Sequence, residues 1–364
     1  MYLFKNCNKL KLNSNMKKYL LILFVLQMTF LARGQNQKGK FVFDQLYSTS
    51  LENAGGEENT RRVSVYIPSG YNSSTNNYPV IYYLHGITQT DRSVIDNNKI
   101  ADMLNKSIAE EKIKPFIFVM CDQYTLYRGS FYTNSSFTGN WSDFTAKDLV
   151  SYVDQKYRTI PDRQSRGIAG HSMGGHGAIK LGMLFPDVFS SVYALSPYVL
   201  DLDKDYGTEG KAYIQAQTIK SRDTLITGYK YINANAVIAL GRAFSPNPKK
   251  PPFYADLPYS YEGDRLIINK SVLELWNKNL PNKMINDYVN NLKSLKAIKL
   301  DWGRNDFFTH IPPTCRKFSK KLDELDINHF AEEYNGSHGD KIYTDDGRFI
   351  NDMLPFFNTY LNFE

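Results

Sequence analysis

Residues 170–177 read GHSMGGHG, and within this stretch Gly170, Ser172 and Gly174 form the pattern GxSxG. The preceding residues, RGIAG, have the composition of a buried strand, and a helical pattern begins at Met173. Ser172 should therefore occupy a tight turn between strand and helix, which holds a serine hydroxyl exposed above the edge of a sheet. A phosphate-binding loop is disfavoured because the GK[ST] ending is missing. The pattern predicts that Ser172 is a nucleophile.

A serine hydroxyl becomes a good nucleophile when a base takes its proton and an acid orients that base. At such a turn the partners follow the serine in the order Asp or Glu, then His, each from a loop at the carboxyl end of a strand. His85 and His171 precede Ser172, and His176 lies in the helix that follows it. His338, in NGSHGD, directly follows a predicted strand and is the expected general base.

The same rule sorts the remaining histidines and the acidic residues. His310 comes just after the strand that should supply the acid, and His329 enters its strand at the amino end. Asp306 follows the strand end in WGRND, whereas Asp301 lies inside the strand, in IKLDW. We therefore expect Asp306 to orient the base, with Asp301 as the second candidate.

The oxyanion of a tetrahedral intermediate needs backbone N–H groups that are already in place. One is expected from Met173, directly after the nucleophile, and the other from Ile87 in the loop LHGIT, where Gly86 permits the turn. His85 either steadies this loop or is a buried histidine with its hydrogen bonds satisfied.

Neither a metal ion nor a cofactor is expected. His171 and His176 are five residues apart and do not share a helix face, and the chain has no HExxH motif or Cys/His cluster. Cys121 and Cys315 fit two readings, either two buried apolar residues or one disulfide.

Short apolar runs alternate with helical patterns, which predicts an α/β protein with a mainly parallel, twisted sheet covered by helices on both faces. The first run alternates like a half-buried antiparallel strand, and the later ones are continuously apolar. The expected strands are 63–67, 78–86, 115–122, 166–172, 190–197, 297–303 and 329–336. Four helices are expected. The first begins near residue 145, the second begins at 173, the third spans 313–325, and the fourth spans 348–361 with a kink at Pro355.

Residues 198–294 do not follow this alternation of strand and helix patterns. They are rich in aromatic side chains and end in helical patterns. We expect an insertion above the sheet that acts as a lid or substrate wall, or else a helical layer that only packs.

The first 34 residues resemble a secretory signal peptide. Lys17 and Lys18 lead into the apolar run 19–31, and Ala32-Arg33-Gly34 offers small residues for cleavage, with translation starting at Met1 or at Met16. The run is short for a membrane helix. The expected mature part is 35–364, secreted or periplasmic, without a stable membrane span.

Charge excludes another class of partner. Residues 1–34 contain six lysines or arginines and no acids, so their removal lowers the formal net charge from +7 to +1. A nearly neutral mature chain lacks the basic footprint of a protein that binds nucleic acid or acidic membranes.

The chain resembles the esterase D-like branch of the α/β-hydrolases, which includes feruloyl esterases, S-formylglutathione hydrolases and mycolyltransferases. The resemblance is carried by YLHGITQTD, GSFYTNSSFTGNW, RGIAGHSMGGHGAIKLGMLFPDVFSSVYALSP, GRNDFF and GSHG. It implies the α/β-hydrolase fold, with Ser172, Asp306 and His338 as triad and Ile87 and Met173 as oxyanion donors. Gln89 stands where S-formylglutathione hydrolases usually have cysteine, and Gly339 follows the histidine where feruloyl esterases often have tryptophan.

These features predict an exported serine esterase that cleaves carboxylic esters through an acyl-enzyme. The aromatic insertion and the exported address favour a small-molecule or polysaccharide-linked ester, of feruloyl or acetyl type. An acyltransferase of the same fold would form the same acyl-enzyme and exclude water. A non-catalytic binding module on this scaffold is the third reading.

Overall fold

The computed structural model describes residue 18 and residues 38–364. Apart from Lys18, the predicted signal peptide lies outside the described residues and stays a prediction. Within the described part of the chain, no helix is both long and apolar enough to cross a bilayer.

One sheet of eight strands forms the centre of the protein, in the order β1-β2-β4-β3-β7-β8-β11-β12. All strands from β4 to β12 in this order run parallel, and β2 is antiparallel to β1 and β4. The strands are β1 (Lys40–Tyr47), β2 (Thr60–Ile67), β3 (Val80–Leu84), β4 (Ile117–Cys121), β7 (Arg166–His171), β8 (Ser191–Leu195), β11 (Ala297–Gly303) and β12 (Phe330–Tyr334). The sheet is mainly parallel, as the sequence predicts.

Strand β1 was not predicted because this edge strand leaves a weak pattern in the sequence. None of its eight side chains is buried, and polar residues interrupt its apolar run. Edge strands of this kind are held by the ladder to one neighbour and need little burial of their own.

Helices cover both faces of the sheet, and alternate side chains of the buried strands join the two cores. Val80 and Tyr82 belong to the core beneath α5, α6 and α13, whereas Ile81 and Tyr83 belong to the core beneath α2, α3 and α14. The helices are α2 (Asp91–Asn97), α3 (Ile100–Ala109), α5 (Leu149–Lys156), α6 (Met173–Leu184), α13 (Ile311–Glu324) and α14 (Leu354–Tyr360). Strands buried on both faces explain the continuous apolar runs in the sequence.

Two helices depart from their predicted form. The helix expected near residue 145 begins earlier, at α4 (Trp141–Asp143), and passes through a π-helical turn, Phe144–Asp148, before α5. The irregularity expected at Pro355 takes the form of a second π-helical turn, Phe349–Met353. Pro355 lies in the first turn of α14, where a missing N–H costs little.

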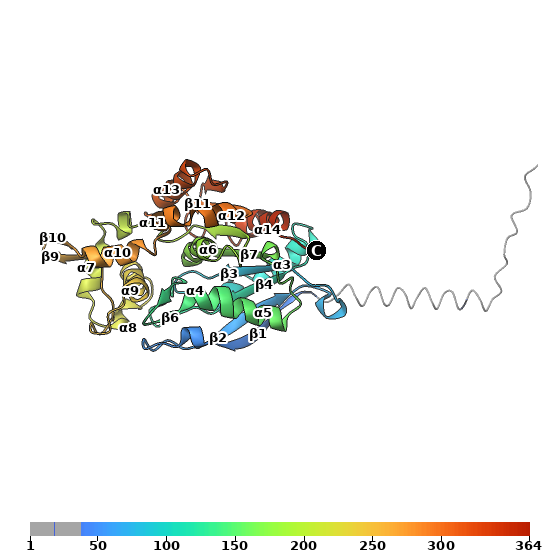
Figure 1. Ribbon diagram of the computed structural model, residues 1–364, viewed down its shortest axis with the longest axis horizontal. Helices are drawn as coiled ribbons and strands as arrows, with labels where there is room; N and C mark the ends of the chain where they lie inside the picture. The colour runs from blue at the N-terminus through green and yellow to red at the C-terminus, as the bar shows by residue number, and fades with distance from the viewer. Residues whose placement is uncertain (1–17, 19–37) are drawn as a thin grey trace, which may run out of the picture.

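Most of residues 198–294 form a layer beyond one end of the sheet, where α7, α8, α9, α10 and the β9–β10 hairpin gather, whereas α12 lies over the sheet beside α14 (Figure 1). The elements are α7 (Lys211–Thr218), α8 (Arg222–Leu225), α9 (Ile232–Phe244), β9 (Tyr259–Glu262), β10 (Arg265–Ile268), α10 (Lys270–Asn277), α11 (Pro281–Met284) and α12 (Val289–Ser294). Helices dominate, as expected, but the hairpin was not predicted. The layer docks on the loop after β4, where Arg128 donates to the carbonyls of Ile226 and Gly228 at 2.9 and 2.6 Å.

Both cysteines described by the structure are buried and unpaired. Burial raises the pKa of the Cys121 and Cys315 thiols well above their usual range. They are therefore apolar core residues with little thiolate character.

A buried lysine joins α6 to this insertion. The Lys180 Nζ donates to Thr133 Oγ1 at 2.6 Å and to Asn279 Oδ1 at 2.8 Å, and no acid pairs with it within the described residues. Burial lowers the pKa of Lys180 to about 7.

This lysine should make stability depend on pH. Between pH 7 and 10.5 the unfolded chain binds a proton at Lys180 that the folded chain has lost, so the free energy of unfolding rises with pH across this window. Lys180→Met removes the free-energy cost of burying a charged lysine. In the wild type this cost is fully present below about pH 7. Urea unfolding gives the free energy of unfolding of the variant and of the wild type at each pH. The value for Lys180→Met minus the value for wild type should fall by several kcal/mol from pH 7 to 10. Lys249→Met, at an exposed site, should show no such trend.

Candidate active site

Ser172 stands on the sharp turn between β7 and α6. Its φ of 61° and ψ of −120° are backbone angles that a non-glycine residue rarely adopts. Its N–H donates to the Leu195 carbonyl at 2.9 Å, and its own carbonyl accepts from Tyr198 at 3.0 Å. These bonds to the end of β8 hold the strained turn in place.

The two glycines of the GxSxG pattern let the neighbouring segments approach closely. A Cβ on Gly170 would lie 2.4 Å from the Gly174 backbone, and a Cβ on Gly174 would lie 1.9 Å from the Leu84 carbonyl oxygen. Both separations are far below contact distance. The turn can therefore be built only with glycine at these positions.

Gly174→Ala should consequently destabilise the protein by at least about 3 kcal/mol, because the backbone of β3 would have to move. Urea unfolding followed by circular dichroism measures this loss. The matched control is Gly339→Ala, since nothing lies within 4 Å of a Cβ built there, and it should cost less than about 1 kcal/mol. Equal stability of the two variants would contradict the proposed close approach.

The structure brings Ser172, His338 and Asp306 together from three strand ends. The His338 Nε2 lies 2.9 Å from Ser172 Oγ, and its Nδ1 lies 2.8 Å from Asp306 Oδ2. All three residues are buried. When His338 carries its proton on Nδ1 and uses it in a hydrogen bond to the Asp306 carboxylate, Nε2 is free to accept the serine proton. This arrangement can activate an oxygen nucleophile.

The loops that carry the acid and the histidine are locked to each other. A Cβ on Gly303, the last residue of β11, would lie 2.5 Å from the carbonyl oxygens of Gly336 and Ser337. The N–H of Asn305 donates to the Gly336 carbonyl at 2.9 Å. The other carboxylate oxygen, Asp306 Oδ1, accepts from the Phe308 N–H at 2.9 Å. The carboxylate therefore faces His338 in a fixed orientation.

The second candidate acid, Asp301, lies elsewhere. Its carboxylate accepts from the Tyr193 hydroxyl and lies 3.3 Å from Arg348 Nη1, on the face of the sheet covered by α14. Burial raises the pKa of Asp301 to about 6. Asp301 therefore belongs to the core and does not contact His338.

The two candidate oxyanion residues lie beside the serine. Met173 begins α6, where an amide has no acceptor within the helix. A Cβ on Gly86 would lie 3.3 Å from Ser172 Cβ, which places the Ile87 loop next to the serine. Thr88 N–H donates to the Arg128 carbonyl at 2.8 Å and fixes the residue after Ile87.

Four other histidines make hydrogen bonds with a structural role. His85 is buried, accepts from the Gln123 N–H at 2.9 Å and lies 2.9 Å from the Gly86 carbonyl, which fits both readings considered for it, a residue that steadies the loop and a buried histidine with its hydrogen bonds satisfied. His176 contacts the Val199 carbonyl at 3.1 Å, and burial lowers its pKa to about 3. His310 accepts from the Val199 N–H, and His329 lies 2.7 Å from Ser319 Oγ.

His171 contacts the site in a way that the sequence analysis missed. Its Nε2–H donates to the backbone carbonyl of His338 at 2.9 Å, and the two rings lie 4.8 Å apart. Burial and the neighbouring His338 lower the pKa of His171 to about 3, so it stays neutral. The order rule removed it as a base because it precedes Ser172. Its place at the carboxyl end of a central strand was the signal that could have indicated a supporting role.

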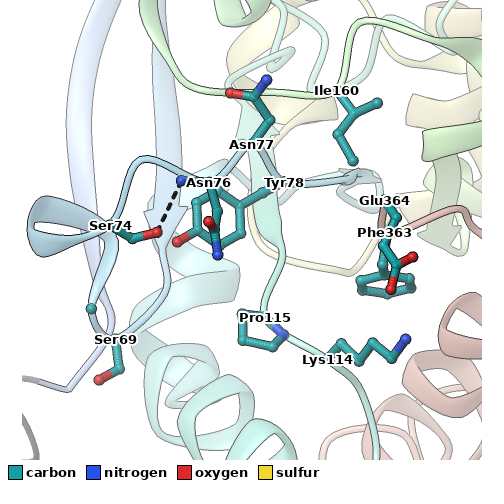
Figure 2. A pocket seen from close by; sticks show the side chains of 11 residues that line it. Ser69, Ser74, Asn76, Asn77, Tyr78, Lys114, Pro115, Ile160, Phe363 and Glu364 are labelled. Atoms are coloured by element: carbon teal, nitrogen blue, oxygen red, sulfur yellow. Dashed lines mark hydrogen bonds between the residues drawn. The ribbon is translucent and has the colours of Figure 1, made fainter.

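A cavity of about 750 Å³ lies far from this chemistry (Figure 2). It is lined by Tyr78, Pro115 and Ile160, which precede β3, β4 and β7. It therefore opens at the amino ends of the parallel strands, whereas Ser172 follows a carboxyl end. The described residues contain no group of three or more His, Cys, Asp or Glu side chains placed to hold a metal ion.

Solved structures identify the fold. A ferulic acid esterase superposes with a TM-score of 0.59 and 22% sequence identity, covering 90% of this chain and 100% of that one. At this identity the likeness shows the fold, which is that of the α/β-hydrolases.

The sequence identifies the family. A family model described as "Putative esterase" matches residues 57–259, more than half of the chain, which therefore belongs to this esterase family. An esterase of Mycobacterium tuberculosis is 33% identical over 150 residues, 40% of this chain and 30% of that protein. An endo-1,4-beta-xylanase/feruloyl esterase of Xylanibacter ruminicola is 32% identical over 138 residues, 35% of this chain and 18% of that protein. The matches thus span less than a third of the length of these relatives.

Proposed function

We propose that this protein is a serine esterase that hydrolyses carboxylic esters, with Ser172, His338 and Asp306 as its catalytic triad. The 2.9 Å approach of His338 Nε2 to Ser172 Oγ, with Asp306 on the other ring nitrogen, carries the proposal. Membership of the esterase family supports it.

In the first half of the reaction, Ser172 Oγ forms a bond to the ester carbonyl carbon while its proton passes to His338 Nε2. The amides of Met173 and Ile87 receive the oxyanion. The bond to the leaving alcohol then breaks, and His338 returns the proton to the alcohol oxygen.

In the second half, a water oxygen attacks the acyl-enzyme while His338 takes one of its protons. The bond to Ser172 breaks, the serine oxygen recovers the proton, and the carboxylic acid leaves. Asp306 holds the imidazole in the right tautomer and stabilises its positive charge in both halves.

We further propose that the mature chain, residues 35–364, is exported and acts on feruloyl- or acetyl-type esters of carbohydrate, with the 198–294 insertion as a substrate wall. A similar protein bears the name xylanase/feruloyl esterase, which supports this substrate class. The leader-like pattern of residues 1–34 supports export.

The proposal is tested with the purified chain from residue 35 onward. A fluorophosphonate probe should label Ser172, and a panel of methyl ferulate, acetylated xylan and p-nitrophenyl acetate should give the free acids. If the probe does not label the chain and none of the esters is hydrolysed, the protein is a non-catalytic binding module and the proposal is wrong. Transfer of the acyl group to an added alcohol in place of hydrolysis would indicate an acyltransferase.

A further inference from the structure

The acid loop, residues 306–310, begins with the proposed acid of the triad and is anchored by a second carboxylate from the insertion. Asp205 lies in the short 3-10 helix Lys204–Tyr206. Its Oδ1 accepts from Thr309 Oγ1 at 2.8 Å, and its Oδ2 accepts from His310 Nδ1 at 3.2 Å. Both donors directly precede α13. One carboxylate thus fixes two consecutive residues of the acid loop.

The protonation of this pair follows from its surroundings. The Val199 N–H donates to His310 Nε2 at 3.1 Å, and because a backbone N–H can only donate, the imidazole carries its proton on Nδ1. Burial lowers the pKa of His310, so the ring is neutral. Burial also raises the pKa of Asp205, but the hydrogen bonds from His310 and Thr309 outweigh this effect and bring the pKa below its usual value. A neutral imidazole therefore donates to a carboxylate anion.

The same imidazole connects the acid loop to the turn of the nucleophile. Val199 directly follows Tyr198, whose N–H donates to the Ser172 carbonyl at 3.0 Å. Val199 has a φ of 59°, which a β-branched residue rarely adopts, so surrounding contacts must hold this segment in place. The bond from its N–H to His310 is one such contact. The serine turn and the acid loop are thereby joined through His310, and Asp205 holds His310 from its other side.

The anchored part of the loop also contacts the acid and the histidine of the triad. Phe308 directly precedes Thr309, and its N–H donates to Asp306 Oδ1 at 2.9 Å. Its ring lies 4.8 Å from the His338 ring and 4.8 Å from the Tyr198 ring, measured between centroids. A shift of Thr309 would therefore move Phe308, and with it the N–H that orients the carboxylate toward His338.

We propose that Asp205 and His310 are positioning residues of the esterase reaction, which hold the acid loop in register with the Ser172 turn. The inference rests on the proposed function. It gives the insertion a part in catalysis that differs from its proposed role as a substrate wall, because Asp205 acts through the acid loop and not through a contact with the ester.

Two substitutions of Asp205 test this role. Asp205→Ala removes both hydrogen bonds, so kcat and kcat/KM for p-nitrophenyl acetate should fall together by about ten- to a hundredfold, with KM unchanged. Asp205→Asn keeps both bonds, because its carboxamide oxygen accepts from His310 while its NH₂ donates to the Thr309 hydroxyl, which can also accept. Its kcat should stay within a few-fold of wild type. An equal loss in the two variants would overturn the inference.

A double-mutant cycle tests whether Asp205 acts through Asp306. In the Asp306→Ala background the carboxylate that the loop positions is gone, so adding Asp205→Ala should lower kcat no further. The residual turnover is measured at high enzyme concentration. A merely structural role of Asp205 predicts the same loss of activity in both backgrounds, and that result would overturn the inference.

Asp162→Ala is the matched control. Asp162 Oδ1 accepts from the Gln164 N–H at 2.7 Å and so caps another 3-10 helix, Arg163–Ser165, which precedes β7 at the edge of the sheet opposite the triad. Its loss should leave kcat unchanged, and urea unfolding checks that every variant is folded. An unchanged kcat in Asp205→Ala would overturn the inference while wild-type turnover upheld the esterase. A wild type that hydrolyses no ester and resists the fluorophosphonate probe would instead refute the proposed function.

Discussion

Ser172→Ala is expected to lower kcat by about a million-fold, because the three residues of such a triad act as a unit and the variant has no atom to form the acyl-enzyme. The remaining activity should reflect only binding and the oxyanion amides. Turnover of p-nitrophenyl acetate by carefully purified enzyme measures the loss, and labelling by the fluorophosphonate probe should disappear with it.

The fold should survive this change. Ser172 Oγ contributes one hydrogen bond, to His338, so the thermal midpoint should move little. Ser191→Ala is the control, since Ser191 is a buried serine within β8, and it should keep full activity and labelling. Full p-nitrophenyl acetate turnover by Ser172→Ala would remove the basis of the proposed function.

Asp306→Asn should lower kcat about ten-thousand-fold, because the substitution forces His338 into the wrong tautomer. The Phe308 N–H already donates to Oδ1, so the carboxamide oxygen will take that position and its NH₂ will face His338 Nδ1. The imidazole must then accept at Nδ1 and carry its proton on Nε2, facing Ser172. A base with its proton already on Nε2 cannot take the serine proton. Single-turnover kinetics with p-nitrophenyl acetate should show slow acylation.

Asp301→Asn makes the same chemical change five residues earlier and serves as its control. Asp301 accepts from Tyr193 and contacts Arg348, so its loss should reduce stability by about 1–3 kcal/mol. The activity of the folded fraction should stay within a few-fold of wild type. A ten-thousand-fold loss in Asp301→Asn with full activity in Asp306→Asn would reverse the assignment of the acid.

The sequence by itself determined the parts of this protein that depend on local geometry and chain order. A tight strand-to-helix turn needs its glycines, so Gly170, Ser172 and Gly174 could be read directly from the pattern. The carboxyl ends of parallel strands meet at one edge of the sheet, so residues that directly follow strands could be grouped by their position in the chain. Asp306 and His338 were selected in this way, and the structure places His338 beside Ser172 and Asp306 beside His338.

Only the tertiary structure decided which side chains face one another. Asp301 and Asp306 both lie at or near one strand end, and the direction of the side chain along β11 sends Asp301 into the core beneath α14. The contact between His171 and His338 joins residues 167 positions apart. The docking of the insertion on the loop after β4 depends equally on contacts between residues far apart in the chain. Such contacts are set by the register of neighbouring elements and leave no periodic signal in the chain.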